Sequence, residues 1–89
     1  MTTIIINGSE MTSKKRAHEY LKEMLGFPEY YGNNLDALCD LLNEKTAPVE
    51  IRLINSEDMV KLLGPYGNSL LDVFKDVSID NENIILDIS

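Results

Sequence analysis

Three short apolar runs along the chain have the composition of β-strands. Residues 4–6 are three isoleucines in succession, closed by the turn signal Asn7-Gly8. A continuous β-branched run is typical of a strand covered on both faces, so the first strand is predicted to be central or well covered. Residues 49–53 alternate apolar with charged side chains, which predicts a second strand with one less covered face. Residues 84–88 supply the third strand.

Between the strands, apolar residues recur at the spacing of helices that bury one side. Each predicted helix begins at a Ser or Asn, residue types whose side chains satisfy the first backbone N–H groups of a helix. Gly26 is typical of the end of the first helix, and residues 64–67 are predicted to be a turn between the last two helices. The predicted helix starts are Ser13, Asn33, Ser56 and Asn68.

The order of these elements predicts an α/β fold. A pair of helices separates each strand from the next, and connections of that length favour parallel strands joined by right-handed crossovers. With 89 residues, of which 44% are hydrophobic, the chain is long enough to build one core. We therefore expect a single domain, residues 1–89, with a three-stranded parallel sheet packed with about four helices.

The charge of the chain narrows the classes of function. Fifteen Asp and Glu against eight Lys and Arg give a net charge of −7, which repels phosphate backbones and argues against nucleic-acid binding. No apolar run approaches the roughly 20 residues that a membrane helix needs, and no export signal is visible ahead of the first strand. The single cysteine, Cys39, cannot form an internal disulfide, which suits a reducing compartment. We expect a cytoplasmic protein without membrane contact.

The acidic residues are concentrated in one segment. Between Lys22 and Lys45 lie five acids and no basic residue, and in the second predicted helix the leucines fall on one side and the acids on the other. One interpretation is a solvated helix face. However, Asp36 and Asp40 are like charges at i and i+4, which destabilises a helix slightly, and they follow a turn with two tyrosines, residues 28–32. These features favour a protein-binding surface.

The same acids make a poor catalytic site. Paired carboxylates act as general acid and base or hold magnesium, but no Lys, Arg or His accompanies them in the segment. His18 falls among charged neighbours and is expected to be exposed or half-buried. Nearby carboxylates are expected to raise the pKa of Cys39, which favours a packing or interface-edge residue over a nucleophile. We expect no enzyme activity, no cofactor and no metal, and a metal-dependent hydrolase using Asp36 and Asp40 is the least favoured hypothesis.

Residues 28–38, PEYYGNNLDAL, resemble the central motif of the barstar family, the inhibitors of barnase-type ribonucleases. The rest of the chain is similar in layout, with an opening strand that ends at Asn7-Gly8 and the segment DVFKD at residues 72–76. The resemblance implies a barstar-like α/β fold, which agrees with the three-stranded parallel sheet predicted from the pattern. It also implies a mechanism, in which the second helix and the preceding loop plug a nuclease active site and carboxylates take the places of RNA phosphates.

The resemblance further implies roles for single residues. Asp40 is expected to be the central phosphate mimic, Asp36 a second partner for an active-site arginine, and Tyr30 the ring that packs on a catalytic-site histidine. Asp76 is expected to form a peripheral salt bridge. The full set of expected nuclease-binding residues is Tyr30, Gly32, Asn34, Leu35, Asp36, Cys39, Asp40, Glu44 and Asp76.

The sequence departs from the family pattern at Cys39, where the family has a tryptophan, and the chain contains no Trp. We therefore hypothesise that nuclease inhibition is kept but tuned to an enzyme other than barnase. The expected partner is a secreted or toxin-type microbial ribonuclease with a basic active site, bound one to one by an inhibitor that is a monomer when free. The alternative is an acidic protein-binding module of the same fold with a different basic partner.

Overall fold

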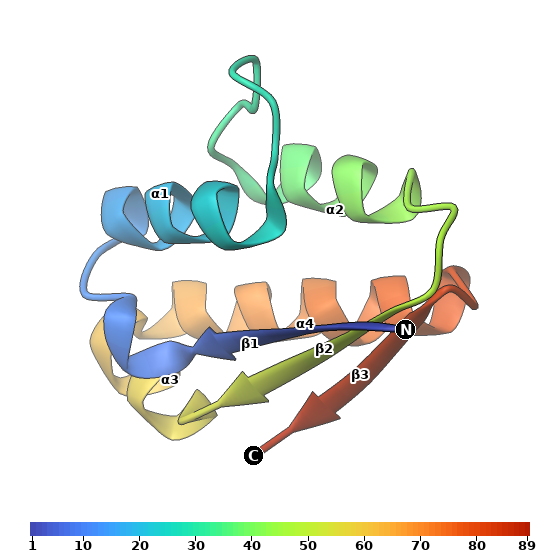
Figure 1. Cartoon of the computed structure of the whole chain (residues 1–89). Coiled ribbons are helices and arrows are strands. Elements are labelled where there is room, and N and C mark those ends of the chain that lie inside the picture. Colours follow the sequence, from blue (N-terminus) through green and yellow to red (C-terminus); the bar gives the residue numbers. More distant parts are fainter.

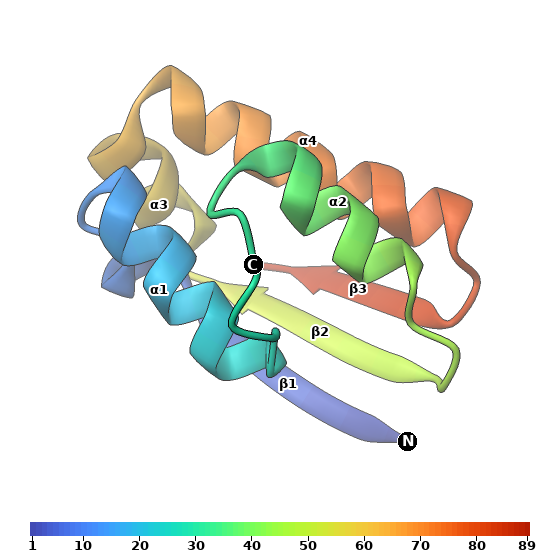
Figure 2. The same ribbon diagram turned by 90° about the horizontal axis from the view of Figure 1, so that it is seen from above.

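The computed structural model describes residues 1–89 and contains one sheet with helices packed against one of its faces (Figures 1 and 2). Its three strands are parallel, in the order β1-β2-β3, with β2 in the centre. The predicted three-stranded parallel sheet with four helices is confirmed. The elements are β1 (Thr2–Asn7), the 3-10 turn η1 (Gly8–Glu10), α1 (Lys14–Leu25), α2 (Leu35–Asn43), β2 (Val49–Ile54), α3 (Ser56–Leu63), α4 (Pro65–Asp80) and β3 (Ile84–Ile88).

β1 lies at an edge of the sheet, so the prediction that it is central or well covered is wrong. In the register with β2, Ile4 lies beside Ile51 and Ile5 beside Arg52. Ile6 is buried toward the helices, whereas Ile5 is 50% exposed on the opposite face of the sheet. An unbroken apolar run does not tell which face is covered, because a strand turns alternate side chains to opposite faces whatever their identity.

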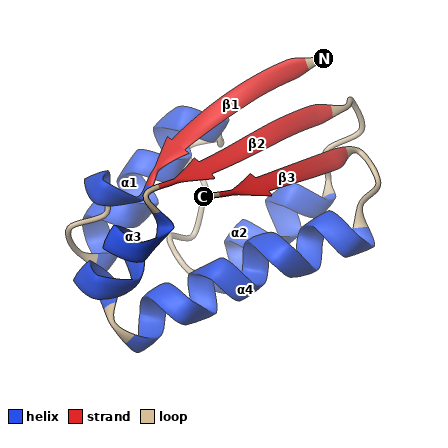
Figure 3. Ribbon diagram, turned by 90° about the horizontal axis from the view of Figure 1, so that it is seen from below, coloured by secondary structure: helices blue, strands red, loops and turns tan.

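β2 follows the alternation seen in its sequence. Val49, Ile51 and Leu53 are buried toward the helices, while Glu50 and Arg52 lie on the other face. No helix runs across that face of the sheet, which is turned toward the viewer in Figure 3. The prediction that one face of this strand is less covered is therefore confirmed.

The core fills the space between the sheet and the helices. Every helix contributes apolar side chains from one side, and each large side chain that is fully buried contributes roughly 1.5–3 kcal/mol to folding. Packing against the sheet therefore stabilises these short helices more than their intrinsic propensity does. The fully buried large apolar residues are Ile6, Met11, Leu21, Leu38, Leu42, Ile51, Leu53, Met59, Leu70, Phe74 and Val77.

The ends of α1 agree with the prediction, and the starts of α2 and α3 are shifted by one residue. The hydroxyl of Ser13 accepts a hydrogen bond from the backbone N–H of Arg16 (3.1 Å) at the start of α1. Gly26 ends the same helix in the left-handed conformation, with a φ of 67°. Asn34, not Asn33, caps α2, and α3 begins after a cap at Asn55 instead of at Ser56.

α4 begins earlier than predicted, at Pro65 instead of Asn68. Gly64 has a φ of 63°, and this left-handed conformation redirects the chain directly after α3. A proline at the first helical position loses no hydrogen bond, so α4 starts at once and the predicted turn is reduced to one residue. Gly67 lies inside α4, where an added Cβ would stand 2.8 Å from a backbone atom of α3, so the glycine allows close packing of the two helices.

Candidate protein-binding site

The loop of residues 26–34 joins α1 to α2 and projects from the helix layer (Figure 1). Its adjacent tyrosines have opposite environments, since Tyr31 is buried and Tyr30 is 79% exposed. The ring of Tyr31 packs on Phe27 with 4.8 Å between the centroids, and its backbone N–H donates to the carbonyl of Pro28 (3.0 Å). The loop thus anchors one ring in the core and presents the other to solvent.

The end of this loop is tied to the first turn of α2. Asn34 Oδ1 accepts a hydrogen bond from the backbone N–H of Ala37 (2.7 Å), and Asn34 Nδ2 donates to the carbonyl of Gly32 (3.2 Å). A cap of this kind contributes about 1 kcal/mol to the stability of a helix. Gly32 and Asn34 are exposed, and Leu35 is partly buried against the core. These three expected binding residues therefore lie where the loop meets the helix.

The exposed side of α2 is acidic. Asp36 lies in its first turn, Asp40 follows one turn later, and Glu44 is the C-terminal cap, and all three are exposed. The helix dipole favours a carboxylate at the position of Asp36 but not near the C-terminus, where its negative end lies. Tyr30, Asp40 and Glu44 line a hollow of about 220 Å³ between the loop and α2. The exposed ring of the loop and the acids of the helix therefore share one surface.

α2 packs along α4, as Figure 2 shows from above. Cys39 is half-buried, and burial is the main reason why the pKa of its thiol is raised. Four carboxylates raise this pKa further, which confirms the expectation from the sequence. In decreasing order of effect they are Asp40, Asp80, Asp76 and Asp36. Two acids of α2 and two of α4 therefore surround the thiol.

The sequence prediction missed Asp80. It lies one helical turn after Asp76 on the exposed side of α4, and this spacing of four residues was the available signal. Only the packing of α4 beside α2 reveals that Asp80 belongs with the acids of the other helix. We refer to the surface formed by these residues as the acidic surface, which comprises Asp36, Asp40, Asp76 and Asp80 near Cys39, together with Glu44 at the end of α2.

No carboxylate of the acidic surface has an ion-pair partner. The two salt bridges of the molecule lie elsewhere and join Lys22 to Glu29 (3.2 Å) and Arg52 to Glu50 (3.5 Å). Unpaired carboxylates on one surface repel one another, and a partner with positive charge relieves this repulsion. The surface is therefore electrostatically complementary to a basic protein.

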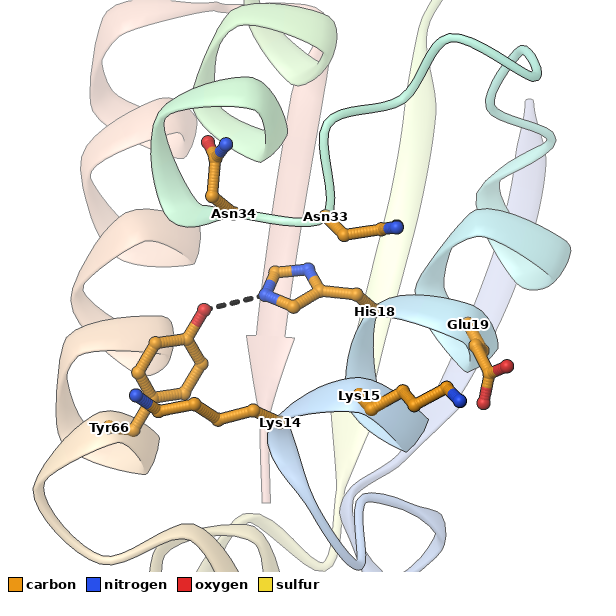
Figure 4. Close-up of a pocket in the computed structure, with 7 residues that line it drawn as sticks. All are labelled: Lys14, Lys15, His18, Glu19, Asn33, Asn34 and Tyr66. Atoms are coloured by element: carbon orange, nitrogen blue, oxygen red, sulfur yellow. Dashed lines mark hydrogen bonds between the residues drawn. The ribbon is translucent and has the colours of Figure 1, made fainter.

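His18 is buried, with 1% of its surface exposed, so the expectation that it is exposed or half-buried is wrong. Its ring nitrogens lie 2.6 Å from the hydroxyl oxygens of Tyr31 and Tyr66. The prediction used the charged neighbours of His18 on α1, but side chains of the loop and of α4 cover the ring. A hollow of about 520 Å³ opens beside the ring (Figure 4). It is lined by Lys14, Lys15, His18, Glu19, Asn33, Asn34 and Tyr66.

Two further findings concern other classes of function. The structure brings no three His, Cys, Asp or Glu side chains together in a group able to hold a metal ion, and Asp36 with Asp40 forms no such group. No helix has the length and apolar character required to cross a membrane.

Comparison with known proteins identifies the family of the chain. A family model described as Barstar (barnase inhibitor) matches residues 1–87. The curated protein named "Putative ribonuclease inhibitor YrdF", from Bacillus subtilis (strain 168), is 39% identical over 77 residues, which is 85% of this chain and 85% of that protein. Both descriptions are those of an inhibitor and not of an enzyme. The chain therefore belongs to the Barstar family.

Proposed function

We propose that this protein is a ribonuclease inhibitor that binds one molecule of a barnase-type enzyme and blocks its active site with the acidic surface and the loop beside it. The observation that carries the proposal is the unpaired state of these carboxylates next to the exposed ring of Tyr30. Membership of the Barstar family and the name of the relative from Bacillus subtilis support a ribonuclease as the partner.

The geometry of α2 suits the mimicry of a phosphate backbone. An active site that binds RNA is lined by cations that neutralise phosphates, so a protein that offers carboxylates in their places binds the same cations. Asp36 and Asp40 stand on successive turns of one helix face, and the caps of α2 hold that helix in place before binding. Preorganised charges of this kind increase the rate and the specificity of association.

Asp40 is assigned the central role among the acids. It is exposed, it has no cation within salt-bridge distance, and it lines the hollow beside Tyr30. When such a carboxylate is desolvated against an enzyme cation, its removal leaves that cation buried and unpaired, which is costly. The barnase–barstar complex is a reference case for this effect, so the expectation for Asp40 rests on that complex.

The identity of the target is expected to depend on Cys39. A thiol presents far less apolar contact area than the tryptophan of the family, so Tyr30 is the large exposed aromatic ring that this surface retains. We infer that the partner is a secreted or toxin-type ribonuclease other than barnase, inhibited in the cytoplasm of the cell that makes it. The small thiol also favours the second candidate, an acidic binding module whose basic partner is not a nuclease.

The test is a titration of RNA cleavage by a panel of microbial ribonucleases, barnase included, with the purified protein at low and at physiological salt. We expect stoichiometric inhibition of one member, with weaker inhibition of barnase. Asp40→Ala is expected to abolish the stoichiometric endpoint, while the matched control Glu23→Ala, an exposed acid of α1, retains it. Tightest binding to barnase would contradict the inference that the target is a ribonuclease other than barnase. If no member of the panel is inhibited, the result favours a basic partner that is not a nuclease.

A further inference from the structure

His18 is buried in the core, and it joins three segments that are distant in the sequence. The residue belongs to α1, Nδ1 contacts the hydroxyl of Tyr31 in the loop, and Nε2 contacts the hydroxyl of Tyr66 in α4, each at 2.6 Å. Figure 4 shows the ring of His18 directed toward Tyr66 from the first turns of α1. Lys14 Nζ lies over the face of the Tyr66 ring, 4.5 Å from its centroid, in a cation–π contact.

The surroundings determine the direction of the two hydrogen bonds. A neutral imidazole has one donor and one acceptor nitrogen, so one tyrosine donates to it and the other accepts from it. The hydroxyl of Tyr31 is buried and has His18 as its one partner, whereas Tyr66 is partly exposed and borders the hollow of about 520 Å³, which is open to solvent. Tyr31 therefore donates to Nδ1, and the Nε2–H group donates to Tyr66, because the reverse order leaves the buried hydroxyl proton of Tyr31 without an acceptor.

Tyr31 connects this core contact to the exposed part of the loop. Its neighbours in the chain are Tyr30 and Gly32, both at the candidate binding site, and its own N–H donates to the carbonyl of Pro28. Tyr30 makes no hydrogen bond through its side chain and is 79% exposed, so its direction depends on the backbone that Tyr31 holds. A bond that fixes the Tyr31 hydroxyl thus restricts the backbone on which the Tyr30 ring is carried.

We propose that His18 is a positioning residue of the nuclease-binding loop, which holds Tyr31 from inside the core so that Tyr30 keeps its binding direction before a partner arrives. This inference rests on the proposed function. It adds to the expected nuclease-binding residues one that is buried and therefore acts without touching the partner. Its physical basis is preorganisation, since a loop that is already ordered loses less conformational freedom on binding.

Protonation of the imidazole is expected to release the loop. The imidazolium ion has two donors and no acceptor, so Tyr31 would have to accept, and its buried hydroxyl proton would lose its partner. The titratable groups that face His18 are Lys14, Lys15 and Glu19 of α1, Tyr31 of the loop and Tyr66 of α4. Burial lowers the pKa of His18, so the neutral form dominates at pH 7.

The experiment compares His18→Gln and Tyr31→Phe with a matched control, Tyr20→Phe. Tyr20 is also a buried tyrosine, and its hydroxyl accepts a hydrogen bond from the backbone N–H of Asn7 (2.9 Å), away from the loop. The first readout is hydrogen exchange of the Tyr31 amide in the free protein. We expect roughly tenfold faster exchange in the two test variants, which is the effect of one lost hydrogen bond, and wild-type exchange in Tyr20→Phe.

The second readout is the inhibition constant for the ribonuclease identified in the panel. We expect it to rise about tenfold in His18→Gln and Tyr31→Phe and to stay at the wild-type value in Tyr20→Phe. Wild-type exchange of the Tyr31 amide in His18→Gln overturns the inference. An equal rise in the inhibition constant for Tyr20→Phe also overturns it, because the effect then reflects general stability.

A pH series separates positioning from a merely structural role. Exchange rates are first corrected for the intrinsic pH dependence of amide exchange. The Tyr31 amide of the wild-type protein is then expected to exchange faster as the pH falls and His18 becomes protonated. In His18→Gln the corrected rate is expected to stay constant over the same pH range. NMR of the ring nitrogens is expected to find the proton on Nε2 at pH 7, and a proton on Nδ1 contradicts the hydrogen-bond direction. Failure of the wild-type protein to inhibit any ribonuclease counts against the proposed function, whereas unchanged exchange counts against the role of His18.

Discussion

The acidic surface and the open face of the sheet are both exposed, but their charges are arranged in different ways. On the sheet, Arg52 lies 3.5 Å from Glu50, the hydroxyl of Thr3 donates to the same carboxylate (3.1 Å), and Arg52 lies beside Asp87 in the register of β2 with β3. Glu50 therefore has partners within the molecule, and Asp87 has a cation on the neighbouring strand. On the acidic surface none of the five carboxylates has an ion-pair partner within the molecule. Four of them raise the pKa of the half-buried thiol of Cys39, in addition to the larger effect of burial.

This difference argues against the interpretation that the acidic side of α2 serves only to keep that side of the helix in contact with solvent. A surface that serves only solubility gains from mixed charges, because opposite neighbours stabilise each other by a few tenths of a kcal/mol. The sheet face follows that rule and the acidic surface does not. The missing counter-charges on α2 and α4 are therefore best supplied by another molecule.

The largest expected effect concerns partner binding. Asp40→Ala should weaken inhibition by at least about 2 kcal/mol, or roughly 30-fold, because an enzyme cation is left buried without its counter-charge. Asp87→Ala, an exposed acid of the sheet face, should change inhibition less than twofold. Inhibition constants for both variants test the contrast. Equal losses would mean that the acids of the molecule act together as a diffuse field.

The next effect concerns pH and the interior beneath the loop. Because burial lowers the pKa of His18 below its ordinary value of 6.5, the unfolded chain takes up this proton first as the pH falls. His18 should therefore reduce the free energy of unfolding below about pH 6.5, by up to about 1.4 kcal/mol per pH unit, until its folded-state pKa is reached. Urea unfolding from pH 7.5 to 5 measures this slope, and a slope that persists in His18→Gln excludes His18 as its origin.

A smaller effect is expected at Cys39. Neutralising a neighbouring acid with Asp80→Asn should lower the pKa of the thiol toward its ordinary value and speed its reaction with an uncharged thiol reagent at pH 8 by roughly twofold. High salt should reduce the difference between the two proteins. Asp87→Asn on the sheet serves as the control. An unchanged rate in Asp80→Asn would show that Asp80 does not contribute to this pKa.

The smallest effect distinguishes the two surfaces by its sign. Asp40→Asn removes a like charge one turn from Asp36 and should raise the free energy of unfolding by about 0.2–0.5 kcal/mol. Arg52→Ala removes the paired cation of the sheet face and should lower it by a similar amount, about 0.2–1 kcal/mol. Urea unfolding at low salt measures both changes. A loss of stability in Asp40→Asn would indicate that the acid has a structural partner.

The errors of the sequence prediction have identifiable physical causes. The isoleucines of β1 mark a strand, but their identity carries no information on which face the helices cover, so the edge position of β1 was missed. The helix starts were displaced because Asn33 and Asn34 are both good caps, and the choice depends on the left-handed backbone of Asn33. His18 was expected to be exposed or half-buried because charged residues stand near it on α1, whereas hydrogen-bond partners 13 and 48 positions away help to bury it.

The sequence by itself determined which segments form strands and helices and which side of α2 is acidic, because these follow from spacing along a single helix or strand. It also determined that the strands are parallel, because the connections between them are long. It also determined the family, through the motif at residues 28–38. Only the tertiary structure decided that Asp80 of α4 lies with Asp76 near the acids of α2, that Tyr30 and Tyr31 face opposite ways, and that His18 lies beneath the loop. These features depend on contacts between distant segments, and such contacts arise when apolar surfaces pack together, which local periodicity does not encode.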